Sequence, residues 1–150
     1  MALYYLDTSA LVKLYVREPG TDRLLQLASH PSENRLAVLA LTPVEVRSAV
    51  RRRQRAGDID IGTAGLILGR LQEHMETRFL RQALNEVVLE GALEIIDRYA
   101  LRAYDAVQLS GCLTLKTIDQ EAPTFVCSDQ QLLDAARSEL LTVLDPCASP

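Results

Sequence analysis

The sequence predicts an α/β fold of three layers, in which helices cover both faces of a central, mostly parallel sheet of about four to five strands. Two observations predict this fold. Short apolar runs alternate with longer segments in which apolar residues recur at helical spacing. In addition, the run 36–41 is apolar at every position, which is typical of a strand buried on both faces. With 150 residues, 48% of them hydrophobic and 24% charged, the chain is expected to form one domain over 1–150.

The opening stretch contains the first strand and the first helix. A strand-like apolar run at 4–6 ends at Asp7. Thr8 and Ser9 then offer N-cap hydroxyls, and apolar residues recur at helical spacing up to position 15. Asp7 is therefore expected at the carboxyl end of a strand, which is the edge of an open parallel sheet where ligands bind.

The next two units follow the same pattern. A turn at 19–21 precedes a short helix at 24–28, and the strand at 36–41 leads into Thr42-Pro43-Val44-Glu45. This segment has the pattern of a capping box, with Thr42 as N-cap, a proline in the first turn and Glu45 three residues after the cap. The helix that follows contains several arginines and is expected to end just before Gly57. Apolar spacing predicts another helix over 61–77, although three glycines weaken it.

The second half of the chain continues the alternation. The segment 79–84 has room for a short strand, and amphipathic helices are expected at 87–99 and 104–116. A strand at 124–127 precedes Ser128-Asp129-Gln130-Gln131, a second capping-box pattern, and a helix at 132–140. The run 141–144 is expected to form the last strand.

Composition excludes several classes of protein. The formal net charge of −4 argues against a non-specific nucleic-acid coat, and no apolar run approaches the ~20 residues of a membrane span. No basic segment precedes the first apolar run, so a secretory signal is not predicted. The three cysteines lack CxxC spacing and indicate free thiols, which favours the cytoplasm. His30 and His74 have no Cys or His neighbours at ligand spacing, so a zinc site is not predicted.

Four acids share one kind of place, a strand-to-helix junction or the first turn of a helix. Three of them follow predicted strands: Asp7, Glu45 and Asp129. The fourth, Asp105, lies in the first turn of a predicted helix. At one end of a parallel sheet these carboxylates would repel one another unless a cation neutralised them. Ligands that are all oxygen favour Mg²⁺ or Mn²⁺. The competing interpretation is that each acid only stabilises a helix N-terminus, typically by ~0.3–1 kcal/mol, and spacing alone leaves both interpretations open.

Four segments, in order along nearly the whole chain, carry a known family pattern. They are Leu6-Asp7-Thr8-Ser9-Ala10-Leu11-Val12, Thr42-Pro43-Val44-Glu45-Val46, Tyr104-Asp105-Ala106-Val107-Gln108-Leu109 and Phe125-Val126-Cys127-Ser128-Asp129-Gln130-Gln131-Leu132-Leu133. Together they resemble the PIN-domain ribonucleases, most closely the VapC toxins of toxin–antitoxin pairs. The ending Leu141-Thr142-Val143-Leu144-Asp145-Pro146 is similar to that family as well. The segment 57–84 and Ser110-Gly111-Cys112 match it less well.

The resemblance implies a metal-dependent endoribonuclease. Its catalytic, metal-binding residues would be Asp7, Glu45, Asp105 and Asp129, which hold Mg²⁺ or Mn²⁺, with supporting hydroxyls from Thr8, Ser9 and Ser128. Water activated by the metal would attack the RNA phosphodiester in line and leave a 5′-phosphate. The resemblance also implies a homodimer and a cognate antitoxin that holds the enzyme inactive. The absence of an apolar run of membrane length predicts no membrane association.

The arginines of 47–55 have a less certain role. Arg52 lies seven positions after Glu45 and so shares its helix face, which makes it the candidate for contact with a substrate phosphate. The other arginines are expected to form a solvated face or to meet a partner. The apolar residues Leu66, Ile67, Leu68 and Leu71 are expected in the core, with a homodimer surface as the alternative.

Other functions remain open at this point. The acids could belong to a non-catalytic acidic-pocket module that regulates or binds a partner, or to a PIN-type nuclease outside any toxin–antitoxin pair. A receiver-type phosphoacceptor is disfavoured because Asp7 stands alone rather than in an acid pair and Lys116 lies inside a predicted helix.

Overall fold

Five parallel strands form the centre of the molecule, in the order β3-β2-β1-β4-β5. The computed structural model describes residues 1–149. The strands are β1 (Ala2–Leu6), β2 (Asn34–Leu39), β3 (Phe79–Gln82), β4 (Thr124–Val126) and β5 (Thr142–Leu144). Strand β1 is central and pairs with β2 on one side and β4 on the other, with Tyr5 opposite Ala37 and Phe125. The predicted three-layer, parallel fold is confirmed, including the short strands at 79–82 and 142–144.

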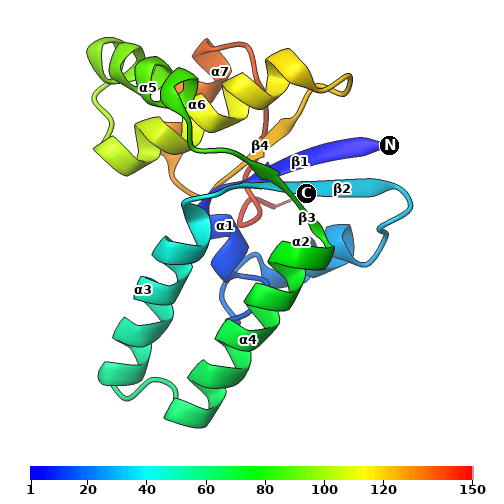
Figure 1. Cartoon of the computed structure of the whole chain (residues 1–150). Coiled ribbons are helices and arrows are strands. Elements are labelled where there is room, and N and C mark those ends of the chain that lie inside the picture. The colour runs from blue at the N-terminus through cyan, green and yellow to red at the C-terminus, as the bar shows by residue number, and fades with distance from the viewer. Residues whose placement is uncertain (150) are drawn as a thin grey trace.

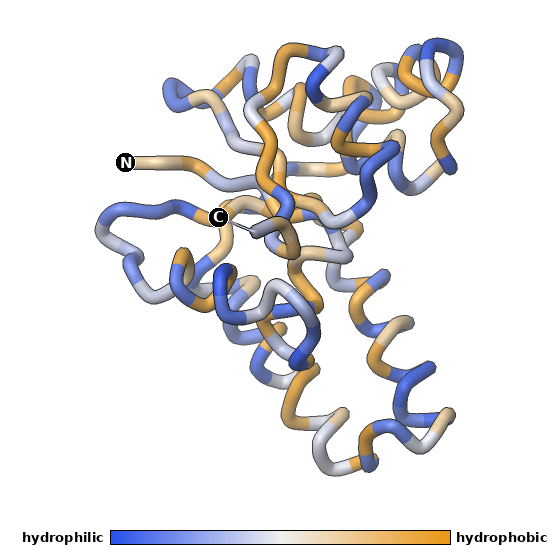
Figure 2. The backbone as a smooth tube through the Cα atoms, turned by 180° about the vertical axis from the view of Figure 1, so that it is seen from behind, coloured by the Kyte–Doolittle hydropathy of each residue, from blue (hydrophilic) through white to orange (hydrophobic). Residues whose placement is uncertain are grey.

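Within residues 1–149, seven helices cover the two faces of the sheet. They are α1 (Thr8–Val12), α2 (Thr21–Ala28), α3 (Thr42–Arg55), α4 (Ile61–Thr77), α5 (Glu86–Arg98), α6 (Ala103–Ile118) and α7 (Gln130–Ser138). Helices α5, α6 and α7 lie on one face and α1 to α4 on the other (Figure 1). Helices α3 and α4 extend away from the sheet side by side, and hydrophobic and hydrophilic residues alternate along both (Figure 2).

Alternating strand residues supply the two halves of the core. In β1, Leu3 and Tyr5 pack towards α5, α6 and α7, whereas Leu6 packs towards α1 to α4. Tyr5 and Leu6 are fully buried although they point to opposite faces, as expected for a parallel strand covered on both sides. The prediction that the apolar residues of 66–71 lie in the core is confirmed for Leu68 and Leu71 but wrong for Leu66, which is on the exposed face of α4.

Both predicted capping boxes are wrong. Helix α3 begins with Leu41 at the N-cap and Thr42 as its first residue, and no side chain caps it. At α7 the N-cap is Asp129, not Ser128, and its carboxylate accepts from the Leu132 N–H. Helix α1 has Asp7 rather than Thr8 or Ser9 at its N-cap. In each case the hydroxyl or carboxyl group that the local pattern assigned to a cap has another partner or another position.

The strand order defines where a site is expected. The chain places β2 and then β3 on one side of β1 and later returns to place β4 and β5 on the other side. In open α/β sheets, ligands bind beyond the carboxyl ends of the strands where the order reverses in this way. Asp7 directly follows the central strand β1 at this point, and its N–H donates to the carbonyl of Val126 at the end of β4.

Candidate active site

A cavity of about 640 Å³ opens at the carboxyl edge of the sheet. Its walls come from the start of α1, from α3 and from the start of α6. Three of the four predicted acids line it: Asp7, Glu45 and Asp105. The predicted residues Thr8, Ser9 and Arg52 line it as well. The parallel sheet thus brings Asp7 into one cavity with Glu45 and Asp105, which lie 38 and 98 positions further along the chain.

Asp7 is the most buried acid of this cavity, with 4% of its surface exposed. Its Oδ1 accepts hydrogen bonds from the Ser9 hydroxyl at 2.7 Å and from the Ala10 N–H at 2.8 Å. Burial raises the pKa of Asp7 from its ordinary 3.8 to about 7; those two hydrogen bonds lower it, and the carboxylates of Asp105 and Glu45 raise it further. No ion pair within residues 1–149 involves this carboxyl group. Asp7 is therefore both a helix cap and a buried acid without a cationic partner.

Glu45 is held by a residue that the sequence analysis missed. Gln108, on α6 and only 2% exposed, donates from Nε2 to Glu45 Oε1 at 3.0 Å. The same nitrogen lies 3.0 Å from the Thr42 hydroxyl and 3.2 Å from the Thr8 hydroxyl, and Gln108 Oε1 accepts from the Tyr5 hydroxyl at 3.4 Å. One buried amide thus connects β1, α1, α3 and α6 around the cavity.

Asp105 differs from the other two acids because it has a cationic neighbour. Arg102, at the N-cap of α6, donates from Nε to Asp105 Oδ2 at 3.1 Å. The Arg102 side chain is 83% exposed, whereas that of Asp105 is 20% exposed. The arginine therefore lies at the outer rim of the cavity, which it also lines, together with Tyr104.

Asp129 and Ser128 are not among the residues that line the cavity. Asp129 caps α7 through the Leu132 N–H at 2.9 Å, and the Ser128 hydroxyl lies 3.6 Å from Cys147 Sγ. Both residues follow β4, next to β1, so Asp129 is at the same edge of the sheet as Asp7. The roles predicted for Asp129 and Ser128 stay predictions.

The acids provide suitable donors for a divalent cation but not a finished site. In the part of the chain that the structure describes, no three side chains of His, Cys, Asp or Glu come close enough together to hold a metal ion. The residues that line the cavity offer carboxylate and hydroxyl oxygens and include no His or Cys, which suits Mg²⁺ or Mn²⁺. The raised pKa of Asp7 also fits, because a cation would relieve the burial and repulsion that disfavour its ionised form.

Basic side chains line the same cavity. They are Lys13, Arg52, Arg53 and Arg102. Arg52 shares the cavity with Glu45, as their spacing on the helix predicts, whereas Arg47 lines a different hollow between α3 and α4 and Arg55 is exposed. The arginine group of 47–55 is therefore divided between several surfaces.

Four further residues at the cavity were not predicted, and their positions in the sequence differ in how far they indicate a role at the site. Gln108 is an amide on the buried face of an apolar helix, three residues after Asp105, and a polar residue at such a position needs partners. Arg102 lies three residues before Asp105, a spacing at which helical side chains meet. Lys13 and Glu18 gave no comparable signal because their contact depends on a loop.

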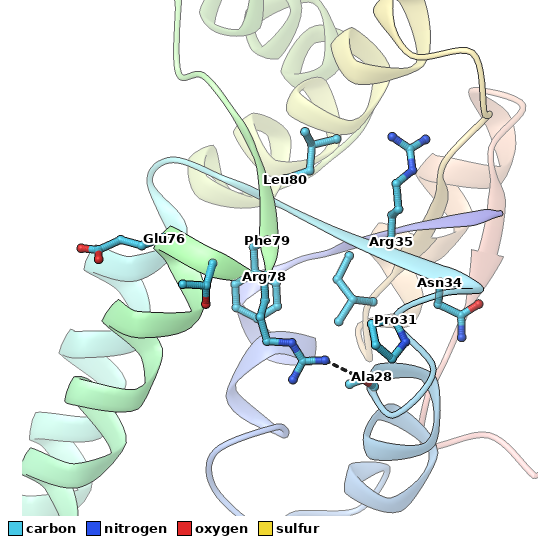
Figure 3. A pocket seen from close by; sticks show the side chains of 10 residues that line it. Ala28, Pro31, Asn34, Arg35, Glu76, Arg78, Phe79 and Leu80 are labelled. Carbon is cyan, nitrogen blue, oxygen red and sulfur yellow. Dashed lines mark hydrogen bonds between the residues drawn. The ribbon is translucent and has the colours of Figure 1, made fainter.

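A hollow at the opposite edge of the sheet lacks this chemistry. It has a volume of about 420 Å³ and lies near the amino ends of β2 and β3. Arg78 spans it and donates to the carbonyl of Ala28 at 2.6 Å, while Glu76, its one acid, points away from the other labelled side chains (Figure 3). The carboxyl edge is therefore the candidate active site.

The family model of the PIN domain matches residues 4–138. The chain belongs to the PIN-domain family. The chain is 32% identical to a protein named ribonuclease VapC35 of Mycobacterium tuberculosis over 146 residues, and the alignment covers 96% of this chain and 97% of that one. Ribonuclease VapC47 of the same organism is 29% identical over 153 residues, covering 97% of this chain and 98% of that one. This PIN domain is therefore VapC-like, and the predicted family is confirmed.

Solved structures show the same fold as this PIN domain. PAE2754 from Pyrobaculum aerophilum superimposes with a TM-score of 0.68 at 21% identity, covering 97% of this chain and 90% of that one. VapBC2 from Rickettsia felis, bound to a DNA fragment from its promoter, gives 0.67 at 13% identity, covering 95% and 98%. FitAB bound to a DNA fragment gives 0.65 at 17% identity, covering 100% and 98%. Within residues 1–149, none of the helices of the PIN domain has the length and apolar character needed to cross a membrane.

Proposed function

We propose that this PIN domain is a metal-dependent endoribonuclease that cleaves RNA phosphodiester bonds. The observation that carries the proposal is the cavity at the carboxyl edge of the sheet, which Asp7, Glu45 and Asp105 all line. Asp7 is buried there without a cationic partner in residues 1–149. The proteins named VapC35 and VapC47, which align over almost the whole chain, are ribonucleases by name and support RNA as the substrate.

Asp7, Glu45 and Asp105 would hold Mg²⁺ or Mn²⁺, with Asp129 as a fourth acid at the neighbouring strand end. When bound, the ion would supply positive charge that polarises the phosphodiester, makes water more acidic and stabilises the leaving oxygen. The described residues would orient the ligands. Ser9 fixes Asp7 through Oδ1, and Gln108 fixes Glu45 through Oε1, so one oxygen of each carboxylate is held in place.

The remaining predicted residues would act on water and substrate. Arg52 lines the cavity on the same helix as Glu45 and would contact a phosphate of the RNA. The hydroxyl of Thr8 is within reach of Gln108, and that of Ser9 is engaged by Asp7, so both support ligands. Ser128 follows β4 beside Asp129 and would act at that side of the site.

The biological role we propose is that of a toxin held inactive by a cognate antitoxin, acting as a homodimer in the cytoplasm. The VapC names and the likeness to VapBC2 and FitAB support a protein partner of this kind. Co-expression with the antitoxin should abolish cleavage, and sedimentation of the purified chain should give the mass of two copies.

The decisive experiment is cleavage of RNA by the purified protein, free of any partner, with Mg²⁺, Mn²⁺ or EDTA. We expect cleavage with metal only, and a loss of at least a hundredfold in Asp7→Asn and Asp105→Asn, because each removes a ligand charge. Asp134→Asn is the matched control, since Asp134 is an exposed acid that pairs with Arg137. Cleavage that persists in EDTA, or in both variants, would contradict the proposal.

A second candidate function is a non-catalytic module with an acidic pocket. It is favoured by one observation, the lack of a ready-made group of three metal ligands among residues 1–149. The same assay separates the two functions when the RNA pool includes structured and single-stranded species. A module of this kind would cleave none of them and would bind no divalent metal.

A further inference from the structure

A second charged group lies in the candidate active site, and the proposed metal chemistry does not use it. Lys13, at the end of α1, donates from Nζ to Glu18 Oε2 at 3.0 Å, and Arg53 of α3 donates from Nη2 to the other oxygen, Oε1. All three residues line the cavity of Asp7. We refer to Lys13, Glu18 and Arg53 as the cationic triad. Only 8% of the Lys13 side chain and 18% of the Glu18 side chain are exposed, so these charges are largely removed from water.

The loop between α1 and α2 holds this triad in position. The hydroxyl of Thr21, which is 5% exposed, donates to the carbonyl of Lys13 at 2.8 Å and accepts from the N–H of Glu18 at 3.0 Å. Gly20 allows the loop to close, since it has a φ of +93° and a Cβ atom there would lie 3.0 Å from the backbone of Pro146. Thr21 therefore ties the backbone at Lys13 to the backbone at Glu18, which places their side chains beside each other.

The triad carries a charge that it does not neutralise. Two cations share one carboxylate, so one unit of positive charge remains, and Arg52 adds another beside it. Arg52 and Arg53 come seven and eight residues after Glu45 on α3, so at a rise of 1.5 Å per residue each lies about 10 to 12 Å from Glu45 along the helix. The cavity therefore has an acidic end at Asp7, Glu45 and Asp105 and a basic end at the triad.

We propose that the cationic triad binds a backbone phosphate of single-stranded RNA, next to the phosphodiester that would lie over the acids. The proposal rests on the proposed ribonuclease function for the identity of its ligand. A guanidinium fork and a primary ammonium side by side offer several directed donors to one phosphate. Single-stranded nucleic acids are typically held by positively charged grooves that follow the backbone, and such contacts do not depend on base sequence.

The competing explanation is that the triad only fastens the α1–α2 loop to α3. The two explanations differ at Glu18. If the triad only holds the loop against α3, replacing Glu18 and replacing Lys13 break the same ion pair, and both changes alter RNA binding in the same direction. If the triad is a phosphate site, Glu18 competes with the phosphate for both cations, and removing it strengthens RNA binding.

The test measures binding rather than cleavage. A short, fluorescein-labelled single-stranded RNA of mixed sequence is titrated with the full chain in EDTA, and fluorescence anisotropy is recorded over a series of KCl concentrations. Lys13→Met and Arg53→Gln are each expected to weaken binding about threefold to tenfold at low salt, uniformly across sequences, and to reduce the slope of log K against log [salt] by about 0.7. Glu18→Gln is expected to tighten binding.

Arg55→Gln is the matched control, because Arg55 is on the same helix, is exposed and does not line the cavity. It is expected to leave RNA binding unchanged. Melting temperatures of all variants monitor folding, and Glu18→Gln tests the proposal even if Lys13→Met does not fold.

The proposal would be overturned by weaker binding in Glu18→Gln, by binding in Lys13→Met and Arg53→Gln equal to that of the wild type, or by no RNA binding of the wild type. Tighter binding of a polyglutamate peptide than of an RNA of equal charge would assign the triad to a protein partner instead and also overturn it. Since EDTA removes metal-dependent cleavage, this result is independent of the nuclease test. If the wild type cleaves RNA but the variants bind RNA as the wild type does, only the proposal for the triad is wrong. If the variants change RNA binding but the wild type does not cleave RNA, only the proposed nuclease activity is wrong.

Discussion

Asp7 combines two roles that the sequence pattern presents as alternatives. Its Oδ1 caps α1 through the Ala10 N–H, as an ordinary N-cap does, and the same carboxyl group is buried in the cavity with Glu45 and Asp105. A cap at the surface gains from its negative charge, whereas burial beside other carboxylates penalises it. Asp60 is the N-cap of α4 and is exposed, and the hydrogen bond from the Thr63 N–H is the main cause of its lowered pKa. A comparison of Asp7 with Asp60 therefore measures the effect of burial on a capping carboxylate.

We predict that Asp7→Asn stabilises the metal-free protein in a pH-dependent way. The pKa of Asp7 is raised from 3.8 to about 7, so the folded state binds the proton more tightly than the unfolded state does. Stability is then lost as the pH rises from about 4 to about 7. Asn caps almost as well and carries no charge, so the gain should be on the order of 1–3 kcal/mol at about pH 8 and vanish near pH 4. Urea unfolding in EDTA at both pH values measures it.

Asp60→Asn is the control for this prediction. Its carboxylate is exposed at a helix N-terminus, so loss of the charge should leave stability unchanged or slightly reduced at about pH 8. If Asp7→Asn behaves like Asp60→Asn, then Asp7 is only a cap, and its burial with the other acids has no energetic consequence.

Glu45 illustrates where prediction from single residues fails. Thr42-Pro43-Val44-Glu45 matches a capping box in sequence, but the partner of both side chains is Gln108, which is 66 and 63 residues away. Local spacing cannot reveal such a partner. The location of Asp7, by contrast, was predictable because an apolar run that ends in an acid and turns into a helix is a local signal. The position of Asp7 could therefore be predicted, whereas the hydrogen bond that holds Glu45 could not.

At the scale of elements, helix α6 can lie close to β1 because it carries Gly111. A Cβ atom at this position would lie 2.4 Å from the Tyr5 hydroxyl and 2.9 Å from a methyl group of Leu39. The Tyr5 hydroxyl in turn donates to Gln108, one turn earlier on α6. The segment Ser110-Gly111-Cys112, which departs from the family pattern, is thus explained by close packing: Ser110 is buried and donates to the Val88 carbonyl at 2.6 Å, and Cys112 is buried as well.

We predict that Gly111→Ala lowers the free energy of unfolding by about 1–3 kcal/mol, because the buried ring of Tyr5 has to move. The movement should also weaken the contact of Tyr5 with Gln108 and reduce RNA cleavage. Gly65→Ala is the matched control: Gly65 lies in α4, and an added Cβ would meet nothing within 4 Å beyond its chain neighbours and the backbone of its own helix, so alanine should stabilise the protein by up to about 1 kcal/mol. Urea unfolding compares the two variants. Equal effects would contradict the close packing of α6 against β1.

The boundaries of the elements were predicted less well than their order. Helices expected at 24–28, 87–99 and 104–116 begin one to three residues earlier, at 21, 86 and 103. Their first residues depend on caps such as Gly20, Asn85 and Arg102, of which only Asn85 accepts a hydrogen bond through its side chain. Apolar periodicity predicts the body of a helix but does not locate its first turn. Asp105 lies in the first turn of α6.

At the scale of the whole molecule, the sheet order brings the charges together. A chain with a net charge of −4 has a cavity lined by four acids and four bases, because β1 ends between β2 and β4, and α1, α3 and the start of α6 lie around that end of the strand. The acids of this cavity come from α3, α6 and the β1–α1 junction, together with Glu18 of the α1–α2 loop. A cation that bridges these elements would therefore stabilise the fold as a whole and not one helix alone.

We predict that saturating Mg²⁺ or Mn²⁺ raises the melting temperature of the wild type. A ligand at a hundred times its Kd adds about 2.7 kcal/mol, which for a chain of this size corresponds to about 5–10 °C. Asp7→Asn should lose most of this increase because it removes a ligand and the charge that a cation would neutralise. Asp134→Asn should keep it, since Asp134 pairs with Arg137 on the surface. An unchanged melting temperature with both metals would mean that Asp7, Glu45 and Asp105 do not bind a divalent ion. The proposed ribonuclease chemistry would then be wrong, and the cavity would have to act as an acidic binding pocket.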